Sequence, residues 1–336
     1  MTSGRRPTLA DVAADAGVST ALVSIVMRDV PGASAETRAR VLEVAQRLGY
    51  QPDQRARLLR SGHSRLIGVM FDVGNLFFGK LVTGLYAAAE QIDYQLTLSG
   101  TTPARDERTA VRTLLQDRCE ALVLMTATLT PADFAEISAQ VPVVVLGRAV
   151  RHRAVDVIRN DDAAGLHKAV DHLVELGHRR IAHLDGGARN SVSSERRRAY
   201  ATAMGRHGLT DRIQVLAGGA TEADGVRAVR RLLAAPGPRP TAITLYNDQS
   251  AIGAISALRL AGLSVPEDIS VVGFDDEPAA SLDHIDLTTV GQDTATLTRL
   301  AATRAQDRIQ GVPVRQREVI IPPGLVVRGT TARPAG

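Results

Sequence analysis

The sequence predicts a small all-α head followed by a larger α/β body with parallel sheets. In the first 65 residues, apolar positions recur at helical spacing between capping residues; from Leu66 onward, short apolar runs alternate with amphipathic stretches. The length of 336 residues suits two or three domains. Charge divides the chain in the same way, because residues 1–65 carry ten arginines against six acids and the remainder carries 30 basic and 30 acidic residues.

Three short helices are predicted in the head. Thr8 followed by Asp11 is the pattern of a capping box, and Gly17 can end the helix that starts there. Ser19 is the predicted cap of a second helix, and a third is predicted from Ser34 to Gly49. Two short helices joined through a glycine turn form a helix-turn-helix, whose second helix reads the DNA major groove.

The second helix would present four outward positions to base edges, namely Thr20, Ala21, Ser24 and Ile25. The alternative is a generic three-helix module that packs on the rest of the protein. The excess of positive charge in the head favours DNA binding over that alternative.

The body is predicted to hold buried strands at 66–71, 121–125, 143–146, 180–184, 242–245 and 269–274. Amphipathic helices fall between these runs, for example at 163–176 before Gly177. Residues 53–62 are densely charged, which argues against a packed helix in isolation. We therefore expect a DNA-binding domain at 1–52, a hinge at 53–63 and an effector-binding and dimerisation domain at 64–336.

Four segments resemble the LacI/GalR family of bacterial transcription regulators, and the resemblance extends from about residue 8 to 331. They are residues 8–24, Gly177-His178-Arg179-Arg180-Ile181, 269–276 and 320–329. The resemblance implies a two-lobed body similar to periplasmic sugar-binding proteins. One lobe is expected at 64–162 and 292–322, the other at 163–291 and 323–332. The family binds near-palindromic operator DNA as a homodimer and responds to a small-molecule effector, commonly a carbohydrate, in the cleft between the lobes.

For DNA binding, the resemblance implies a hinge that forms a helix on the operator and inserts a leucine into the minor groove. Leu59 matches that leucine, whereas Leu58 is assigned to packing within the hinge pair. Three departures from the family bear on DNA binding: Ile25, where Arg often reads guanine, Asp53, where Asn is usual, and Arg55, where an apolar residue often packs the two hinges together. An apolar Ile25 suits a thymine methyl group instead. The predicted DNA-binding residues are Thr8, Ser19, Thr20, Ala21, Ser24, Ile25, Arg55, Arg57, Leu59 and Arg60.

For the effector, the resemblance implies an arginine near the start of a helix and an aspartate just past a strand, which here are Arg196 and Asp275. Charged side chains of this kind can each form two hydrogen bonds with sugar hydroxyls. The remaining predicted ligand-binding residues are Asn75, Phe77, Phe78, Tyr246 and Asn247. Structural alternatives stay open, because Asp248 can cap a helix and both phenylalanines can belong to the core.

Other classes of function find little support. The chain contains no Gly-x-Ser-x-Gly, Walker, Gly-x-Gly-x-x-Gly or His-Glu-x-x-His motif, and Cys119 is its only cysteine. We therefore expect no enzyme activity, cofactor or metal. No apolar run reaches membrane-spanning length and no secretory signal is evident, so we expect a cytoplasmic protein without a membrane partner. A transport-associated binding protein and an architectural DNA binder remain as rivals. The chain lacks the leucine-rich C-terminal extension of tetrameric relatives, which favours a dimer.

Overall fold

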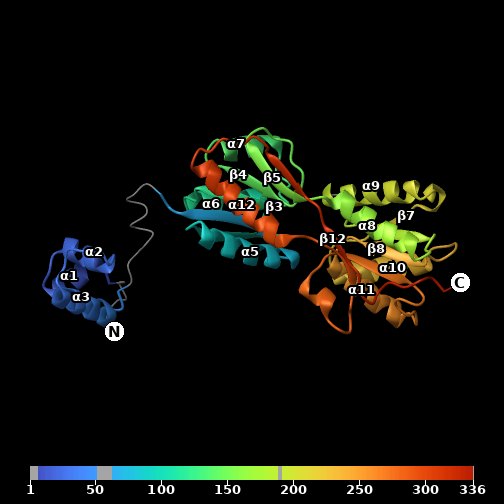
Figure 1. Cartoon of the computed structure of the whole chain (residues 1–336), viewed down its shortest axis with the longest axis horizontal. Coiled ribbons are helices and arrows are strands. Elements are labelled where there is room, and N and C mark those ends of the chain that lie inside the picture. The colour runs from blue at the N-terminus through green and yellow to red at the C-terminus, as the bar shows by residue number, and fades with distance from the viewer. Residues whose placement is uncertain (1–6, 51–62, 188–190, 336) are drawn as a thin grey trace. The chain divides into compact units, whose positions relative to one another are not determined.

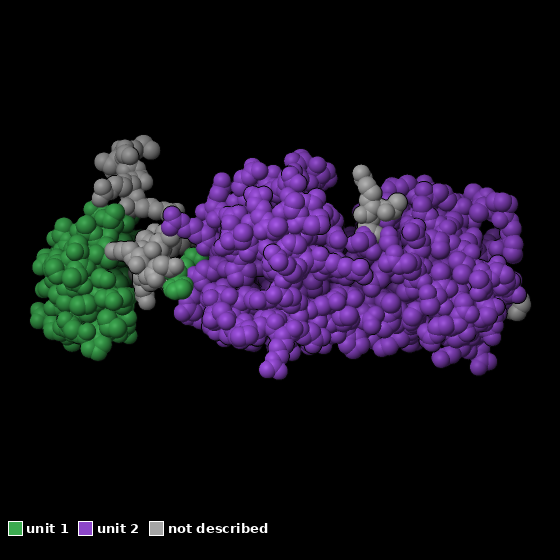
Figure 2. Space-filling model, turned by 90° about the horizontal axis from the view of Figure 1, so that it is seen from above, with its two compact units in different colours: residues 1–64 green, residues 65–336 purple. Residues whose placement is uncertain are grey.

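The computed structural model describes residues 7–50, 63–187 and 191–335. The chain divides into two compact units, residues 1–64 and 65–336, which are coloured separately in Figure 2. The first unit is helical and the second is α/β, so the predicted fold class is confirmed. The predicted hinge, including Arg55, Arg57, Leu59 and Arg60, lies outside the described residues apart from its last position.

The head contains the three predicted helices, α1 (Leu9–Ala16), α2 (Thr20–Met27) and α3 (Ala35–Leu48). Thr8 and Asp11 form the predicted capping box, and Gly17 ends α1 in the left-handed conformation at φ 65°. The axes of α1 and α2 differ by 106°, which is typical of a helix-turn-helix. Eight apolar side chains form the core of this unit: Val12, Ala13, Ala16, Val23, Val26, Val41, Val44 and Ala45.

Within residues 7–50, 63–187 and 191–335, no single helix is long and apolar enough to cross a membrane. The pair α1 and α2 satisfies the length and composition criteria only when taken together across its 106° bend.

The first sheet of the body has the order β11-β5-β4-β3-β1-β2, and all its strands are parallel. Helices α5 and α12 cover one face of this sheet, and α6 and α7 cover the other (Figure 1). We call this sheet and its helices lobe 1. Its strands are β1 (Leu66–Asp72), β2 (Gln95–Thr101), β3 (Ala121–Met125), β4 (Val143–Leu146), β5 (Val155–Asn160) and β11 (Glu318–Ile321). Its helices are α5 (Phe77–Gln91), α6 (Glu107–Gln116), α7 (Pro131–Ser138) and α12 (Thr294–Ile309).

The second sheet has the order β12-β10-β9-β8-β6-β7 and is parallel except for β12, which pairs antiparallel with β10. We call this sheet and its helices lobe 2. Its strands are β6 (Ile181–Leu184), β7 (Gln214–Leu216), β8 (Ala242–Leu245), β9 (Ser270–Asp275), β10 (Thr288–Gly291) and β12 (Gly324–Val326). Its helices are α8 (Asp162–Glu175), α9 (Ser191–Arg206), α10 (Glu222–Ala234) and α11 (Asp248–Leu260), with short 3₁₀ turns at Thr210–Arg212 and Pro278–Ser281.

The six apolar runs in the body correspond to β1, β3, β4, β6, β8 and β9, which confirms those predicted strands to within one residue at each end. Sequence analysis missed β2, β5, β7, β10, β11 and β12. None of these strands has a long, purely apolar run. Strands β2 and β7 lie at sheet edges and carry polar residues, β5 contains Asp156 and Arg159, and β10 to β12 are only three or four residues long.

The chain passes between the two sheets three times, at residues 160–162, 291–294 and 321–324. In each sheet the strand order reverses direction at the first strand, β1 or β6. Ligands of such sheets bind beyond the carboxyl ends of the strands at this switch point. The carboxyl ends of β1, β8 and β9 border one cavity, which therefore lies at the carboxyl edges of both sheets.

Candidate functional site

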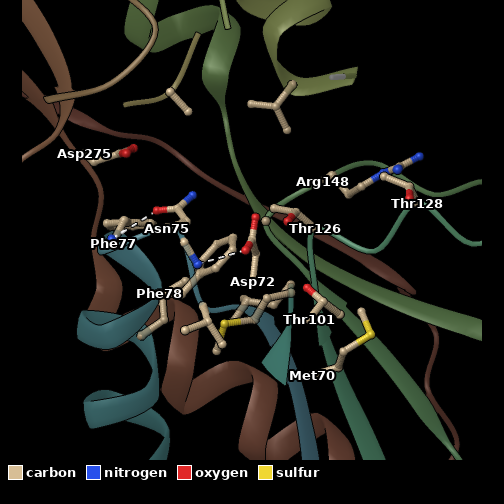
Figure 3. Close-up of a pocket in the computed structure, with 18 of the residues that line it drawn as sticks. Met70, Asp72, Asn75, Phe77, Phe78, Thr101, Thr126, Thr128, Arg148 and Asp275 are labelled. Atoms are coloured by element: carbon tan, nitrogen blue, oxygen red, sulfur yellow. Dashed lines mark hydrogen bonds between the residues drawn. The ribbon is translucent and has the colours of Figure 1, made fainter. Parts of the chain in front are cut away.

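A cavity of about 1000 Å³ lies between the two sheets of the body. Figure 3 shows part of its lining, with Asp275 across the cavity from Asp72 and Asn75. Most polar groups follow strand ends or begin helices, where parallel sheets concentrate them. The polar lining residues include Asp72, Asn75, Thr101, Thr126, Thr128 and Arg148 of lobe 1, together with Asp162, Arg196, Tyr246, Asp275 and Gln292.

Arg196 of α9 is held on several sides at the wall of this cavity, and only 4% of its surface is exposed. Its Nε donates to Asp162 Oδ1 at 2.7 Å, its Nη1 donates to the carbonyl of Tyr246, and its Nη2 lies 3.7 Å from Asp275 Oδ1. The guanidinium carbon also stacks 3.4 Å from the centre of the Phe274 ring. The arginine therefore has a single orientation before any effector binds, which lowers the entropic cost of binding.

Asp275 ends β9 with a backbone φ of 113°, a left-handed value that few side chains adopt. This conformation turns its carboxylate toward the cavity, where Gln292 Nε2 donates to Oδ1 at 2.6 Å. Burial raises the pKa of Asp275 to about 6, and the charge of Arg196 opposes that rise. Strained backbone and a buried carboxylate at one position are typical of a binding site.

The lobe 1 wall begins with a turn after β1. Asn75 Oδ1 accepts a hydrogen bond from the backbone N–H of Phe77 at 3.1 Å, and Asp72 Oδ1 accepts one from Gly74 N at 2.9 Å. Phe77 and Phe78 are both buried, lie 6.5 Å apart between ring centres, and both line the cavity. The two phenylalanines thus belong to the core and to the cavity wall together.

Asn247 and Asp248 lie at the start of α11, and neither lines the cavity. Asn247 is the helix cap, because its Oδ1 accepts from Ser250 N at 3.0 Å, while its amide nitrogen donates to the carbonyl of Ala220. Asp248 does not cap; its buried carboxylate accepts from Thr289 Oγ1 at 2.5 Å and from Glu277 N at 2.7 Å. These two hydrogen bonds of Asp248 hold the loop after β9 and so help to position Asp275.

Sequence analysis missed several lining residues, notably Asp72, Asp162, Arg148 and Gln292. Asp72 directly follows the predicted strand at 66–71 and ends β1, so its position was a usable signal. Asp162 begins α8 next to the cap Asp161, and an acid there is ordinary in a first helical turn. Only the packing of α8 against α9 brings it to Arg196.

In the head, the predicted DNA-reading residues occupy two kinds of position. Thr8 and Ser19 cap α1 and α2 through their side chains. Thr20 and Ala21 are exposed on the first turn of α2, whereas Ser24 and Ile25 are half-buried. The Ile25 side chain lies near the loop at Gly32, where a hypothetical Cβ would come within 3.4 Å of it.

Two family models match the chain. Residues 8–53 match the model described as bacterial regulatory proteins, lacI family, and residues 170–331 match a periplasmic binding protein-like domain. The regulator GalS of Salmonella typhimurium is 33% identical over 301 residues, which cover 89% of this chain and 88% of that protein. The chain belongs to the lacI family of bacterial regulatory proteins.

Two solved structures of transcriptional regulators resemble this one over nearly its whole length. A lac repressor dimer bound to operator and the anti-inducer ONPF is 30% identical, with a TM-score of 0.83 over 98% of this chain and all of that one. A complex of the transcriptional regulator CelR with cellobiose is 28% identical, with a TM-score of 0.70 over 97% of this chain and all of that one. These relatives are transcriptional regulators rather than enzymes.

No group of acidic, histidine or cysteine side chains suited to a metal ion occurs in the part of the chain that the structure describes. His172 and His178 instead bind the C-terminal segment: His172 Nε2 contacts Thr331 Oγ1 at 3.0 Å, and His178 Nε2 contacts the Ala332 carbonyl at 2.9 Å.

Proposed function

We propose that this lacI-family regulator binds a near-palindromic operator as a homodimer, acts as a repressor, and is controlled by a carbohydrate or similar polyhydroxylated effector in the cavity between its lobes. One observation carries the proposal: the same chain joins a helix-turn-helix head to a cavity where Arg196 and Asp275, from separate elements, lie 3.7 Å apart. DNA recognition and ligand binding thereby belong to one molecule.

On the DNA side, α2 would lie in the major groove and present Thr20, Ala21, Ser24 and Ile25 to base edges. Small hydroxyl and apolar side chains discriminate bases weakly, so much of the sequence preference would come from DNA deformation. Leu59 would supply it by wedging into a central minor-groove step. The operator-bound dimer of the lac repressor supports this arrangement.

On the effector side, the chemistry of the lining favours a neutral molecule with several hydroxyl groups. Carboxylates at Asp72 and Asp275 accept hydrogen bonds, Arg148 and Arg196 donate them, and threonine hydroxyls do both. Phe77 and Phe78 supply an apolar surface against which the face of a ring can pack. The CelR–cellobiose complex supports a sugar as the ligand class.

Coupling between the sites would follow from differential affinity. An effector that contacts both lobes prefers one relative orientation, operator DNA prefers the other, and each weakens the other's binding by the same factor. Release of DNA by the effector is the direction we propose.

The first test is to incubate the purified full-length protein with fragmented DNA of its source genome at near-physiological salt, and to sequence the retained fragments. A small set of enriched palindromes is the expected result. Uniform retention would contradict operator specificity and favour an architectural DNA binder. Genes beside the enriched sites then nominate sugars to titrate against the operator complex.

The second test uses Arg196→Lys, which keeps the positive charge but loses the planar fork. The effector concentration for half-maximal release should rise by roughly 10- to 100-fold, since hydrogen bonds to charged groups contribute about 1.5–3 kcal/mol. Operator affinity without effector should stay unchanged. Arg198→Ala is the matched control, because Arg198 lies exposed on the same helix. An unchanged effector response in Arg196→Lys would refute the assigned role.

A further inference from the structure

A second charged surface lies at the opposite end of lobe 1 from the effector cavity. This groove, of about 470 Å³, borders the starts of β4 and β5, and we call it the basal groove. Its charged lining residues are Arg153, Arg308, Arg317 and Asp156, so they sum to +2. Residues 66–336 as a whole carry 30 basic and 30 acidic residues, which makes this a local excess.

The only carboxylate of this lining is already neutralised. Asp156 is 1% exposed, and its oxygens accept from Arg308 Nε at 2.5 Å, Arg308 Nη2 at 2.9 Å and Arg304 Nη1 at 3.3 Å. Arg153 and Arg317 are exposed and form no ion pair with any described residue. Two arginines without a carboxylate partner among the described residues therefore face solvent on one groove.

The basal groove lies at the edge of the lobe 1 sheet that the chain enters from residues 51–64, which we call the linker. All strands of the lobe 1 sheet run parallel, so β5 and β11 start at the same edge as β1, into which Arg65 leads from the linker. Strand β5 lies three positions from β1, a distance of about 14 Å at ordinary strand spacing. Figure 1 shows the end of α12, in red, at the same end of lobe 1 as the start of β1.

The length of the linker limits how far this edge can be from bound DNA. Between Tyr50 and Arg65 the chain can span at most about 50 Å when fully extended. This limit keeps the Tyr50 end of the DNA-binding head within about 50 Å of Arg65, which enters the sheet edge that carries the basal groove. Uncompensated guanidinium groups facing a nearby polyanion are attracted to it.

We infer that the basal groove binds the phosphate backbone of DNA that flanks the operator, through Arg153 and Arg317. This inference rests on the proposed operator binding. Guanidinium forks match phosphate oxygens, and such contacts add affinity without adding base preference. The body would thus contribute directly to DNA binding, beside the head.

The experiment compares two duplexes that hold the same captured operator. The short duplex has about 20 base pairs, enough for two half-sites, and the long duplex adds about one helical turn on each side. The full-length protein should bind the long duplex more tightly, with a steeper dependence of affinity on salt. The double variant Arg153→Ala/Arg317→Ala should bind the short duplex like the unaltered protein but lose the gain on the long one.

Two phosphate contacts per subunit make four in a dimer. The double variant should therefore make the negative slope of log affinity against log salt shallower by about 3 to 4. The matched control is Arg198→Ala/Arg230→Ala, which removes the same charge from exposed helical positions of lobe 2. The control should keep the full gain from the flanks. An equal gain in the double variant, or no gain in the unaltered protein, would overturn the inference. Failure of all these proteins to bind the short duplex would overturn the proposed function, and this inference with it.

Discussion

Replacement of Arg196 by alanine gives a large and specific prediction for the stability of the body. The side chains of Asp162 and Asp275 are only 3% and 6% exposed, and both lie within 3.7 Å of the Arg196 guanidinium. Removing the cation leaves two buried carboxylates without their partner. Breaking a buried ion pair in this way costs about 3–5 kcal/mol, which corresponds to a melting temperature lower by roughly 6–20 °C for a unit of this size.

The assay is thermal unfolding at neutral pH of the unaltered protein, Arg196→Ala and the control Arg198→Ala. The control should change the free energy of unfolding by less than about 1 kcal/mol, because the charge it removes is exposed. Adding Asp162→Asn to Arg196→Ala should restore part of the loss, since it removes one of the two unpaired charges. If Arg196→Ala unfolds within about 1 kcal/mol of Arg198→Ala, the buried ionic cluster does not stabilise the fold as argued.

Three further predictions address the site and the DNA. Burial raises the pKa of Asp275 to about 6, and the carboxylate accepts stronger hydrogen bonds from hydroxyl groups than the protonated acid does. Affinity for a neutral effector should therefore rise between pH 5 and 7. Calorimetric titrations should show this rise, and Asp275→Asn should flatten it. Gly273→Ala should lower the free energy of unfolding of the body by about 1–3 kcal/mol in urea, because the added Cβ would collide with the Asp248 carboxylate and lie 2.8 Å from Leu287 Cδ2. Unchanged stability would mean that Asp248 and Leu287 move aside at no cost. Leu59→Ala should weaken operator binding and leave binding to random DNA nearly unaltered, because nonspecific affinity is electrostatic; equal losses on both DNAs in a gel-shift titration would remove the wedge.

The helix ends of the head were predictable because their determinants are close in sequence. Thr8 bonds to a residue three positions away, and Ser19 bonds to Leu22 N at 3.2 Å. The continuous buried strands of the body were also predictable, since a fully apolar run of four or five residues is typical of a parallel strand that is buried on both faces. Strands of mixed polarity such as β2 were not, because their pairing depends on neighbours elsewhere in the chain.

The effector site was predictable only in part. Arg196 and Asp275 came from resemblance to a family. Helical spacing places Arg196 on the buried face with Ala199 and Tyr200, but spacing alone does not indicate a ligand-binding role. At the start of α11, sequence reasoning considered Asp248 as the cap, whereas the structure gives that role to Asn247. Both side chains can cap a helix. Asp248 is not the cap because its carboxylate instead accepts hydrogen bonds from Thr289 and Glu277, which lie in other elements.

The sequence by itself determined the division into a basic helical head and a neutral α/β body, because charge balance and apolar periodicity are sums over local segments. It also determined where the three helices of the head and six of the buried strands of the body lie. Only the tertiary structure decided which charges meet. Asp162, Arg196 and Asp275 come from α8, α9 and β9, and Arg153, Arg308 and Arg317 come from three further segments of lobe 1. Electrostatic energy depends on distance through space and on burial, and neither quantity is encoded in the spacing of residues along the chain.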